Sequence, residues 1–133
     1  MKSGDAVNAA KAILVVDDEP AILESIVEVL RDEGYAVESA RNGQAALLVF
    51  EQSAPDLVLM DVMMPGLDGR AAYIAMRAHP RGQDIPVVLM SAAADPNRLA
   101  PSVTAFLPKP FDLDQLLDLV ARLLSNGSTS AVE

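Results

Sequence analysis

Two kinds of hydrophobic pattern alternate along the chain. Five short segments have the pattern of strands, and the first of them, AILVV, is fully apolar, which is typical of a strand that is buried on both faces of a parallel sheet. These segments lie at residues 12–16, 35–40, 57–60, 85–90 and 103–107. Between them, apolar residues recur at the spacing of amphipathic helices. The sequence therefore predicts strands and helices in alternation.

Residues that favour helix ends mark the helical stretches. Helices are predicted over residues 20–33, 43–52 and about 70–79, and from residue 113 onward. Pro20 suits the first position of a helix, and Asn42 suits an N-cap. Asp112 followed by Gln115 has the spacing of a capping box. With right-handed crossovers, this alternation predicts an α/β fold with a doubly wound parallel sheet, although periodicity does not give the strand order.

The chain is expected to form one domain. Its 133 residues are enough for a single core. Residues 1–11 are small and polar, and residues 126–133 are rich in Gly, Ser and Thr, so both segments are expected to be flexible tails. The folded domain is therefore expected over residues 12–125. No basic helical segment follows it, which favours a single-domain protein that acts through protein contacts over the alternative, a domain cut from a longer protein.

Composition excludes several classes of function. Nineteen acidic and ten basic residues give a net charge of −9, which disfavours nucleic acid and anionic membranes as partners. The chain has no cysteine and one histidine, His79, which excludes cysteine-ligated metals and histidine clusters. No apolar run reaches the roughly 18 residues of a membrane span, and the N-terminus lacks a signal-peptide core. A cytoplasmic location is expected.

Polar side chains follow four of the predicted strands. In doubly wound sheets, binding sites lie beyond the carboxyl ends of the strands. These positions hold Asp17, Asp18 and Glu19 after the first strand, Asp61 after the third, Ser91 after the fourth and Lys109 after the fifth. Each has an ordinary explanation when taken singly, such as a helix cap for Asp17 or Asp18 and a turn residue for Asp61. Together they are expected to converge on one edge of the sheet.

Such a cluster needs positive charge. Three carboxylates about 4 Å apart repel by about 4 kcal/mol per pair at an effective dielectric near 20. Lys109, which stands between Pro108 and Pro110, is the only lysine of residues 12–125, and its ammonium suits a phosphate oxygen. Few oxygen ligands with room for water favour Mg²⁺ over a calcium cage. The sequence contains no P-loop or GxGxxG motif, so a bound nucleotide is not indicated.

Four short stretches of the sequence form a specific set. They are VVDDEP (15–20), LMDVMMPGLDG (59–69), VVLMSA (87–92) and FLPKPF (106–111). In this order, and across nearly the whole of residues 12–125, they resemble the receiver domain of bacterial two-component response regulators. The resemblance implies a flavodoxin-like, five-stranded parallel sheet with the strand order 2-1-3-4-5.

The resemblance also implies a phosphorylation mechanism. Asp61 matches the phosphoacceptor, which would attack a phosphohistidine of a sensor histidine kinase or histidine phosphotransfer protein and form an acyl phosphate. Lys109 matches the phosphate-binding lysine. Ser91 matches the switch hydroxyl and Phe106 the aromatic switch, whose movements would bias a two-state equilibrium that a downstream protein target reads.

The metal implied by the resemblance is Mg²⁺. Asp18, Asp61 and the backbone carbonyl of Met63 match its ligands, and Asp17 would act mainly through water. No independent turnover is expected, so the protein is not interpreted as an enzyme, although it would phosphorylate itself from phosphohistidine or a small phosphodonor. His79 lies in a polar turn and is given no role.

Three features depart from the family pattern. After the fourth predicted strand, a helix that begins at Pro96 would end at Pro101, so the fourth helix is expected to be short or degraded. Met63 and Ala93 stand where polar groups usually orient a hydrolytic water, which predicts slow self-dephosphorylation. Phe106 has no hydroxyl and cannot donate a hydrogen bond, and its alternative role is that of a static core residue.

Two other classes of protein fit parts of this pattern. A pseudo-receiver would keep the fold as an interaction module without phosphorylation, but the complete set of strand-end residues argues against it. A phosphatase of the haloacid dehalogenase type also uses an aspartyl nucleophile with Mg²⁺, but it needs an acid/base aspartate two positions later. Met63 holds that position here and cannot transfer a proton.

Overall fold

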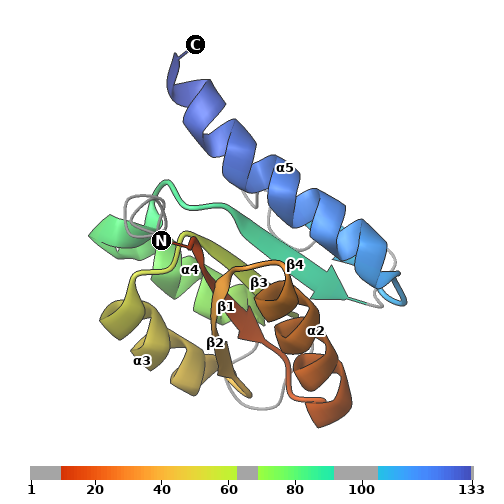
Figure 1. The fold of residues 1–133 in the computed structure, drawn as a ribbon. Helices are drawn as coiled ribbons and strands as arrows, with labels where there is room; N and C mark the ends of the chain where they lie inside the picture. The colour runs from red at the N-terminus through yellow and green to blue at the C-terminus, as the bar shows by residue number, and fades with distance from the viewer. Residues whose placement is uncertain (1–9, 63–68, 92–104, 133) are drawn as a thin grey trace.

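The strands form one parallel sheet whose order matches the prediction. The computed structural model describes residues 10–62, 69–91 and 105–132. Its sheet has the order β2-β1-β3-β4-β5, as the resemblance implied. Figure 1 labels the first four of these strands in chain order, β1 to β4. The strands are β1 (Ala12–Val16), β2 (Ala36–Ala40), β3 (Leu57–Asp61), β4 (Val87–Ser91) and β5 (Ala105–Pro108). Every pair of neighbouring strands is parallel. The predicted doubly wound α/β fold is confirmed.

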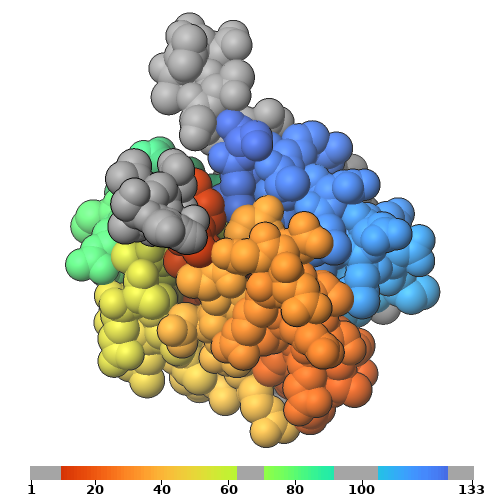
Figure 2. Space-filling model, in the orientation of Figure 1, coloured from red at the N-terminus to blue at the C-terminus, as the bar shows by residue number. Residues whose placement is uncertain are grey.

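Helices cover both faces of this sheet. They are α2 (Pro20–Asp32), α3 (Gly43–Ser53), α4 (Gly69–Ala78) and α5 (Leu113–Val132), with a 3₁₀ turn, η1 (Pro80–Gly82). Alternate residues of β1 show the two faces: Ile13 and Val15 pack into the core under α2 and α5, whereas Leu14 and Val16 pack into the core under α3 and α4. In the space-filling view, α2 and α5 adjoin on one face of the molecule (Figure 2).

The predicted helix starts are present. The Asn42 side chain accepts a hydrogen bond from the Ala45 backbone N–H at 2.8 Å, as an N-cap does. The Gln115 side chain accepts one from the Asp112 backbone N–H at 2.9 Å, which is the returning half of a capping box. Pro20 occupies the first turn of α2.

Some boundaries differ from the predicted ones. α5 continues to Val132, beyond the predicted domain boundary at residue 125. The segment beyond this boundary contains no proline, and each residue added to an existing helix gains a hydrogen bond without a new nucleation cost. The predicted short fourth helix falls within residues 92–104, which lie outside the described residues. Met63 and Ala93 also lie outside the described residues. Within the described residues, no helix combines the length and apolarity that a membrane span requires.

The turn before β4 is held by side chains. His79 Nδ1 accepts a hydrogen bond from the Arg81 backbone N–H at 3.2 Å, and the His79 ring meets the Phe50 ring edge-on at 5.6 Å between centroids. Arg77 donates from one nitrogen to the carbonyls of Gly82 and Ile85, both at 2.7 Å. His79, which the sequence left without a role, therefore helps to form η1.

We expect Gly82→Ala to destabilise the fold. Gly82 is buried, and a Cβ there would overlap the Met76 carbonyl oxygen and lie 2.8 Å from Phe50 Cζ. Because the nearest atom belongs to the backbone, η1 or α4 must shift. The free energy of unfolding in urea should fall by about 1 to 3 kcal/mol.

Gly34→Ala is the matched comparison for this variant. Gly34 has φ 97° and no atom within 4 Å of the added Cβ, so its cost comes from backbone conformation alone, at about 1 to 2 kcal/mol. Wild-type stability in Gly82→Ala would contradict the close packing of η1.

Candidate functional site

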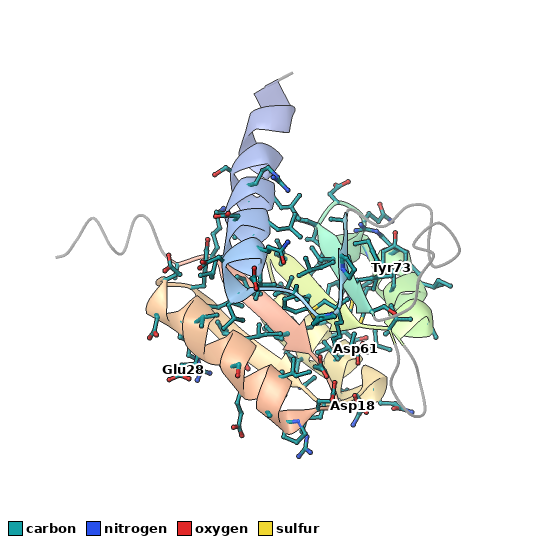
Figure 3. The ribbon with its side chains drawn as sticks, turned by 90° about the vertical axis from the view of Figure 1, so that its right-hand side faces the viewer. Asp18, Glu28, Asp61 and Tyr73 are labelled. Atoms are coloured by element: carbon teal, nitrogen blue, oxygen red, sulfur yellow. The ribbon has the colours of Figure 1, made fainter. Side chains whose placement is uncertain are left out.

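The carboxyl ends of four strands bring the predicted residues to one edge of the sheet. Asp17 follows β1, Asp61 ends β3, Ser91 ends β4 and Lys109 follows β5. Backbone hydrogen bonding extends past the strand ends, where the Lys109 N–H donates to the Ser91 carbonyl at 2.8 Å. Asp18 and Asp61 lie together at this end of the molecule (Figure 3). The predicted convergence is confirmed.

Three carboxylates form a compact cluster. Oxygens of Asp17, Asp18 and Asp61 all lie within 4.8 Å of one another. Asp17 and Asp61 are buried, and Asp18 is half-buried. Among the described residues, no hydrogen bond or ion pair reaches the Asp18 carboxylate. A half-buried carboxylate directed at two others fits a hard divalent cation such as Mg²⁺, because carboxylate oxygens are its preferred protein ligands.

Asp17 does not cap α2. The N-cap position belongs to Glu19, whose side chain makes no capping hydrogen bond. The Asp17 Oδ1 atom accepts a hydrogen bond from the Glu19 backbone N–H at 2.9 Å, and its Oδ2 atom accepts one from Lys109 Nζ, also at 2.9 Å. Both oxygens of this buried carboxylate therefore have a protein donor, which suits an indirect role toward a metal.

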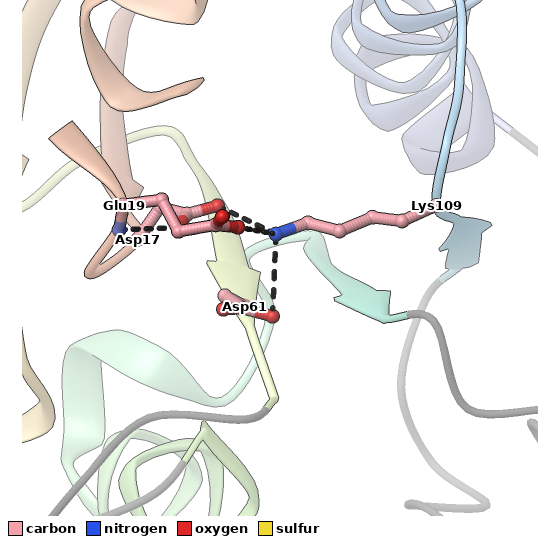
Figure 4. Close-up of polar contacts among 4 residues, drawn as sticks. All are labelled: Asp17, Glu19, Asp61 and Lys109. Atoms are coloured by element: carbon pink, nitrogen blue, oxygen red, sulfur yellow. Dashed lines mark hydrogen bonds and ion pairs between the residues drawn. The ribbon is translucent and has the colours of Figure 1, made fainter. Parts of the chain in front are cut away.

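Lys109 supplies positive charge to the cluster. Its Nζ lies 2.9 Å from Asp17 Oδ2, 3.5 Å from Glu19 Oε1 and 3.6 Å from Asp61 Oδ1 (Figure 4). Burial alone would lower the pKa of Lys109. The hydrogen bond to Asp17 and the charges of Asp17, Asp61 and Glu19 outweigh burial, so the pKa of Lys109 lies above its ordinary value.

Ser91 and Phe106 lie close to this cluster in the sheet. Ser91 is fully buried at the end of β4. Phe106 is half-buried on the neighbouring strand β5, where it pairs in register with Leu89. It packs at the margin of the core under α3 and α4. The switch roles that the resemblance implies for Ser91 and Phe106 stay predictions.

Two features of the site were not predicted. The Glu19 carboxylate contacts Lys109, although the sequence indicated only that Glu19 follows a strand. A groove of about 590 Å³ lies beside the cluster, between α2 and the start of α5. Its lining is mostly apolar and includes Ile22, Phe111 and Leu113, and Lys109 reaches it too. The apolar residues that follow Lys109 in FLPKPF and the apolar face of α2, with Ile22 and Ile26, were the sequence signals for this groove.

Proteins of known sequence and structure resemble the chain over most of its length. The response regulator MprA of Mycobacterium sp. strain KMS is 38% identical over 120 residues, which cover 87% of this chain and 51% of that protein. The chain thus spans about half the length of the curated relatives it matches. The structure of chemotaxis protein CheY4 of Vibrio cholerae matches with a TM-score of 0.82 and 29% identity, covering 86% of this chain and 99% of CheY4.

A further solved structure contains a metal. The receiver domain of sensor histidine kinase PA1611 from Pseudomonas aeruginosa PAO1, with a magnesium ion coordinated in its active-site cleft, matches with a TM-score of 0.81. It is 31% identical, and the match covers 88% of this chain and 99% of that domain. The family model for the response regulator receiver domain matches residues 13–121, which include nearly all of the sheet and every residue of the cluster. The chain therefore belongs to the family of response regulator receiver domains.

Proposed function

We propose that this chain is a signalling switch that is controlled by phosphorylation of Asp61. The donor in this proposal is the phosphohistidine of a sensor histidine kinase or a histidine phosphotransfer protein. The observation that carries the proposal is the placement of the Lys109 ammonium 3.6 Å from Asp61 Oδ1, beside three clustered carboxylates. An acceptor carboxylate, a cation for the phosphoryl oxygens and a metal-binding set are the parts that phosphoryl transfer requires.

The proposed reaction exchanges one phosphorus bond for another. An Asp61 carboxylate oxygen attacks the phosphorus of the donor, the O–P bond forms, and the P–N bond to the donor histidine breaks. Lys109 stabilises charge on the phosphoryl oxygens. Mg²⁺, when bound, neutralises further charge there. Asp18 and Asp61 would hold it together with the Met63 carbonyl, which lies outside the described residues.

The proposed output is a conformational shift rather than turnover. Ser91 would bond to the new phosphoryl group, and Phe106 would turn toward the space that Ser91 leaves. The protein would hold one phosphoryl group per chain and release no product as an enzyme does. A static Phe106 remains the alternative, because this residue already packs against the core.

The groove beside the site supports a protein partner. It is mostly apolar, and Lys109 is among its lining residues, so a molecule seated there would lie next to Asp61. Apolar lining with a charged group at one end is typical of a protein-binding site. A downstream protein target and a cytoplasmic location belong to the same proposal, as does the absence of direct contacts with nucleic acid or membrane.

The test is incubation with acetyl phosphate. In the presence of Mg²⁺, intact mass spectrometry should show a gain of one phosphoryl group, and EDTA should prevent it. Hydroxylamine should remove the group, because it cleaves acyl phosphates. Failure to label with acetyl phosphate and with a phosphohistidine donor would favour the pseudo-receiver alternative. Continuous release of inorganic phosphate would favour a phosphatase.

A further inference from the structure

Glu19 lies at the mouth of the site and contacts its lysine. The Glu19 side chain is 60% exposed, whereas the Lys109 side chain is 14% exposed. The distance from Lys109 Nζ to Glu19 Oε1, 3.5 Å, is nearly the same as the 3.6 Å to Asp61 Oδ1. Glu19 therefore competes with the acceptor for one ammonium, and it does so from the solvent side.

The charges at this edge are unbalanced. Among the described residues, four carboxylates, those of Asp17, Asp18, Glu19 and Asp61, lie around the ammonium of Lys109, and these five groups sum to a formal charge of −3. One bound Mg²⁺ would reduce this charge to −1. Of the four, Glu19 is outside the compact carboxylate cluster and is the one most open to solvent. Among these four carboxylates, Glu19 therefore presents the most exposed negative charge to an incoming anion.

We propose that Glu19 is a specificity-determining residue that discriminates against small anionic phosphodonors. This inference rests on the proposed phosphorylation of Asp61. Glu19 repels a free phosphodonor that approaches as a dianion, and it holds the Lys109 ammonium that would otherwise bind the donor's phosphoryl oxygens. Donors with less negative charge are affected less, because the repulsion scales with the product of the two charges.

The neutral variant Glu19→Gln tests this proposal. The carboxamide keeps the size of the side chain and removes its charge. The second-order rate of labelling by acetyl phosphate should rise by about 3- to 10-fold at low ionic strength. The gain should lie in the concentration of donor that gives half the maximal rate, with little change in the maximal rate. About 1 M salt should remove most of the gain, because it screens exposed charges.

A second phosphodonor distinguishes an effect of the Glu19 charge from an effect of the substitution on the structure. At neutral pH phosphoramidate carries less negative charge than acetyl phosphate, so its gain with Glu19→Gln should be smaller. Glu24→Gln, at an exposed position on α2, removes the same charge from the chain and serves as the matched control. Its labelling rate should equal that of the wild type.

Several outcomes would overturn the inference. The inference on Glu19 fails, while the proposed phosphorylation stands, if the wild type is labelled at Asp61 and Glu19→Gln is labelled no faster than the wild type. It also fails if both donors gain equally, or if Glu24→Gln gains as much as Glu19→Gln. If no variant is labelled by either small donor with Mg²⁺, the inference fails. The proposed phosphorylation fails with it only if a phosphohistidine donor gives no label either. Matching thermal unfolding of the variants excludes a difference in folding.

Discussion

Asp61→Asn should take up no phosphoryl group from acetyl phosphate and Mg²⁺ under conditions that label the wild type. An amide is not a nucleophile for phosphoryl transfer, and asparagine has nearly the same shape as aspartate. Asp61 is 4% exposed, at the end of β3, so the substitution should leave the strand in place. The expected effect is complete loss of the mass increase, which is the largest effect that one substitution can have on labelling.

The control for this variant removes a carboxylate elsewhere. Asp84→Asn makes the same chemical change at an exposed position between η1 and β4, and it should be labelled like the wild type. Circular dichroism and thermal unfolding of Asp61→Asn should show a folded protein. A mass increase that persists in Asp61→Asn would place the acceptor on another residue and contradict the proposed mechanism.

Lys109→Met should lower the stability of the metal-free protein by about 2 to 4 kcal/mol, because it leaves a buried carboxylate without its cation. Asp17 is fully buried, and Lys109 donates a hydrogen bond to its Oδ2 atom. Methionine keeps most of the length and the apolar stem of lysine, so loss of packing contributes little. The free energy of unfolding in urea with EDTA measures the effect.

Mg²⁺ and pH provide two further tests of this prediction. Mg²⁺ should stabilise Lys109→Met more than the wild type, since the variant lacks the ammonium that offsets the carboxylates. In the wild type, the folded-state pKa of Lys109 lies above its ordinary value of 10.5. Its contribution to stability is therefore complete below that value and is lost as pH rises through the folded-state pKa.

The stability gap between the wild type and Lys109→Met should therefore narrow at high pH. Burial and the nearby charge of Glu33 also raise the pKa of Tyr35, which titrates in the same range. Tyr35 is present in both proteins, so its contribution cancels in the difference. A gap that stays constant from neutral pH to pH values above 10.5 would contradict the ion pairing of Lys109.

Sequence patterns predicted most of the fold because buried parallel strands leave a strong local signal. β1 and β3 are continuous apolar runs whose residues are all buried or nearly so, and an acidic residue follows or ends each. The apolar runs therefore located these two strands, and the acidic residues at their ends located the site. The strand order has no local signal, because it depends on which faces the helices cover, and it came from the family resemblance alone.

The parts that sequence missed depend on long-range contacts. Asp17 was open to interpretation as a helix cap, and its true partner, Lys109, lies 92 residues away. The contact between Glu19 and Lys109 spans 90 residues. Such pairings follow from how the strand ends meet, which no local period records. Composition did not give the length of α5, which continues to Val132.

Lys109 belongs to two places at once, the carboxylate cluster and the wall of the groove between α2 and α5. An occupant of the groove that touches Lys109 would therefore be coupled to the charge on Asp61 through this side chain. Thermodynamic linkage makes the effect reciprocal: a partner that prefers the phosphorylated form by about tenfold shifts the phosphorylation equilibrium toward that form by the same factor. Binding in this groove would then raise the share of chains in the phosphorylated state that recruited the partner.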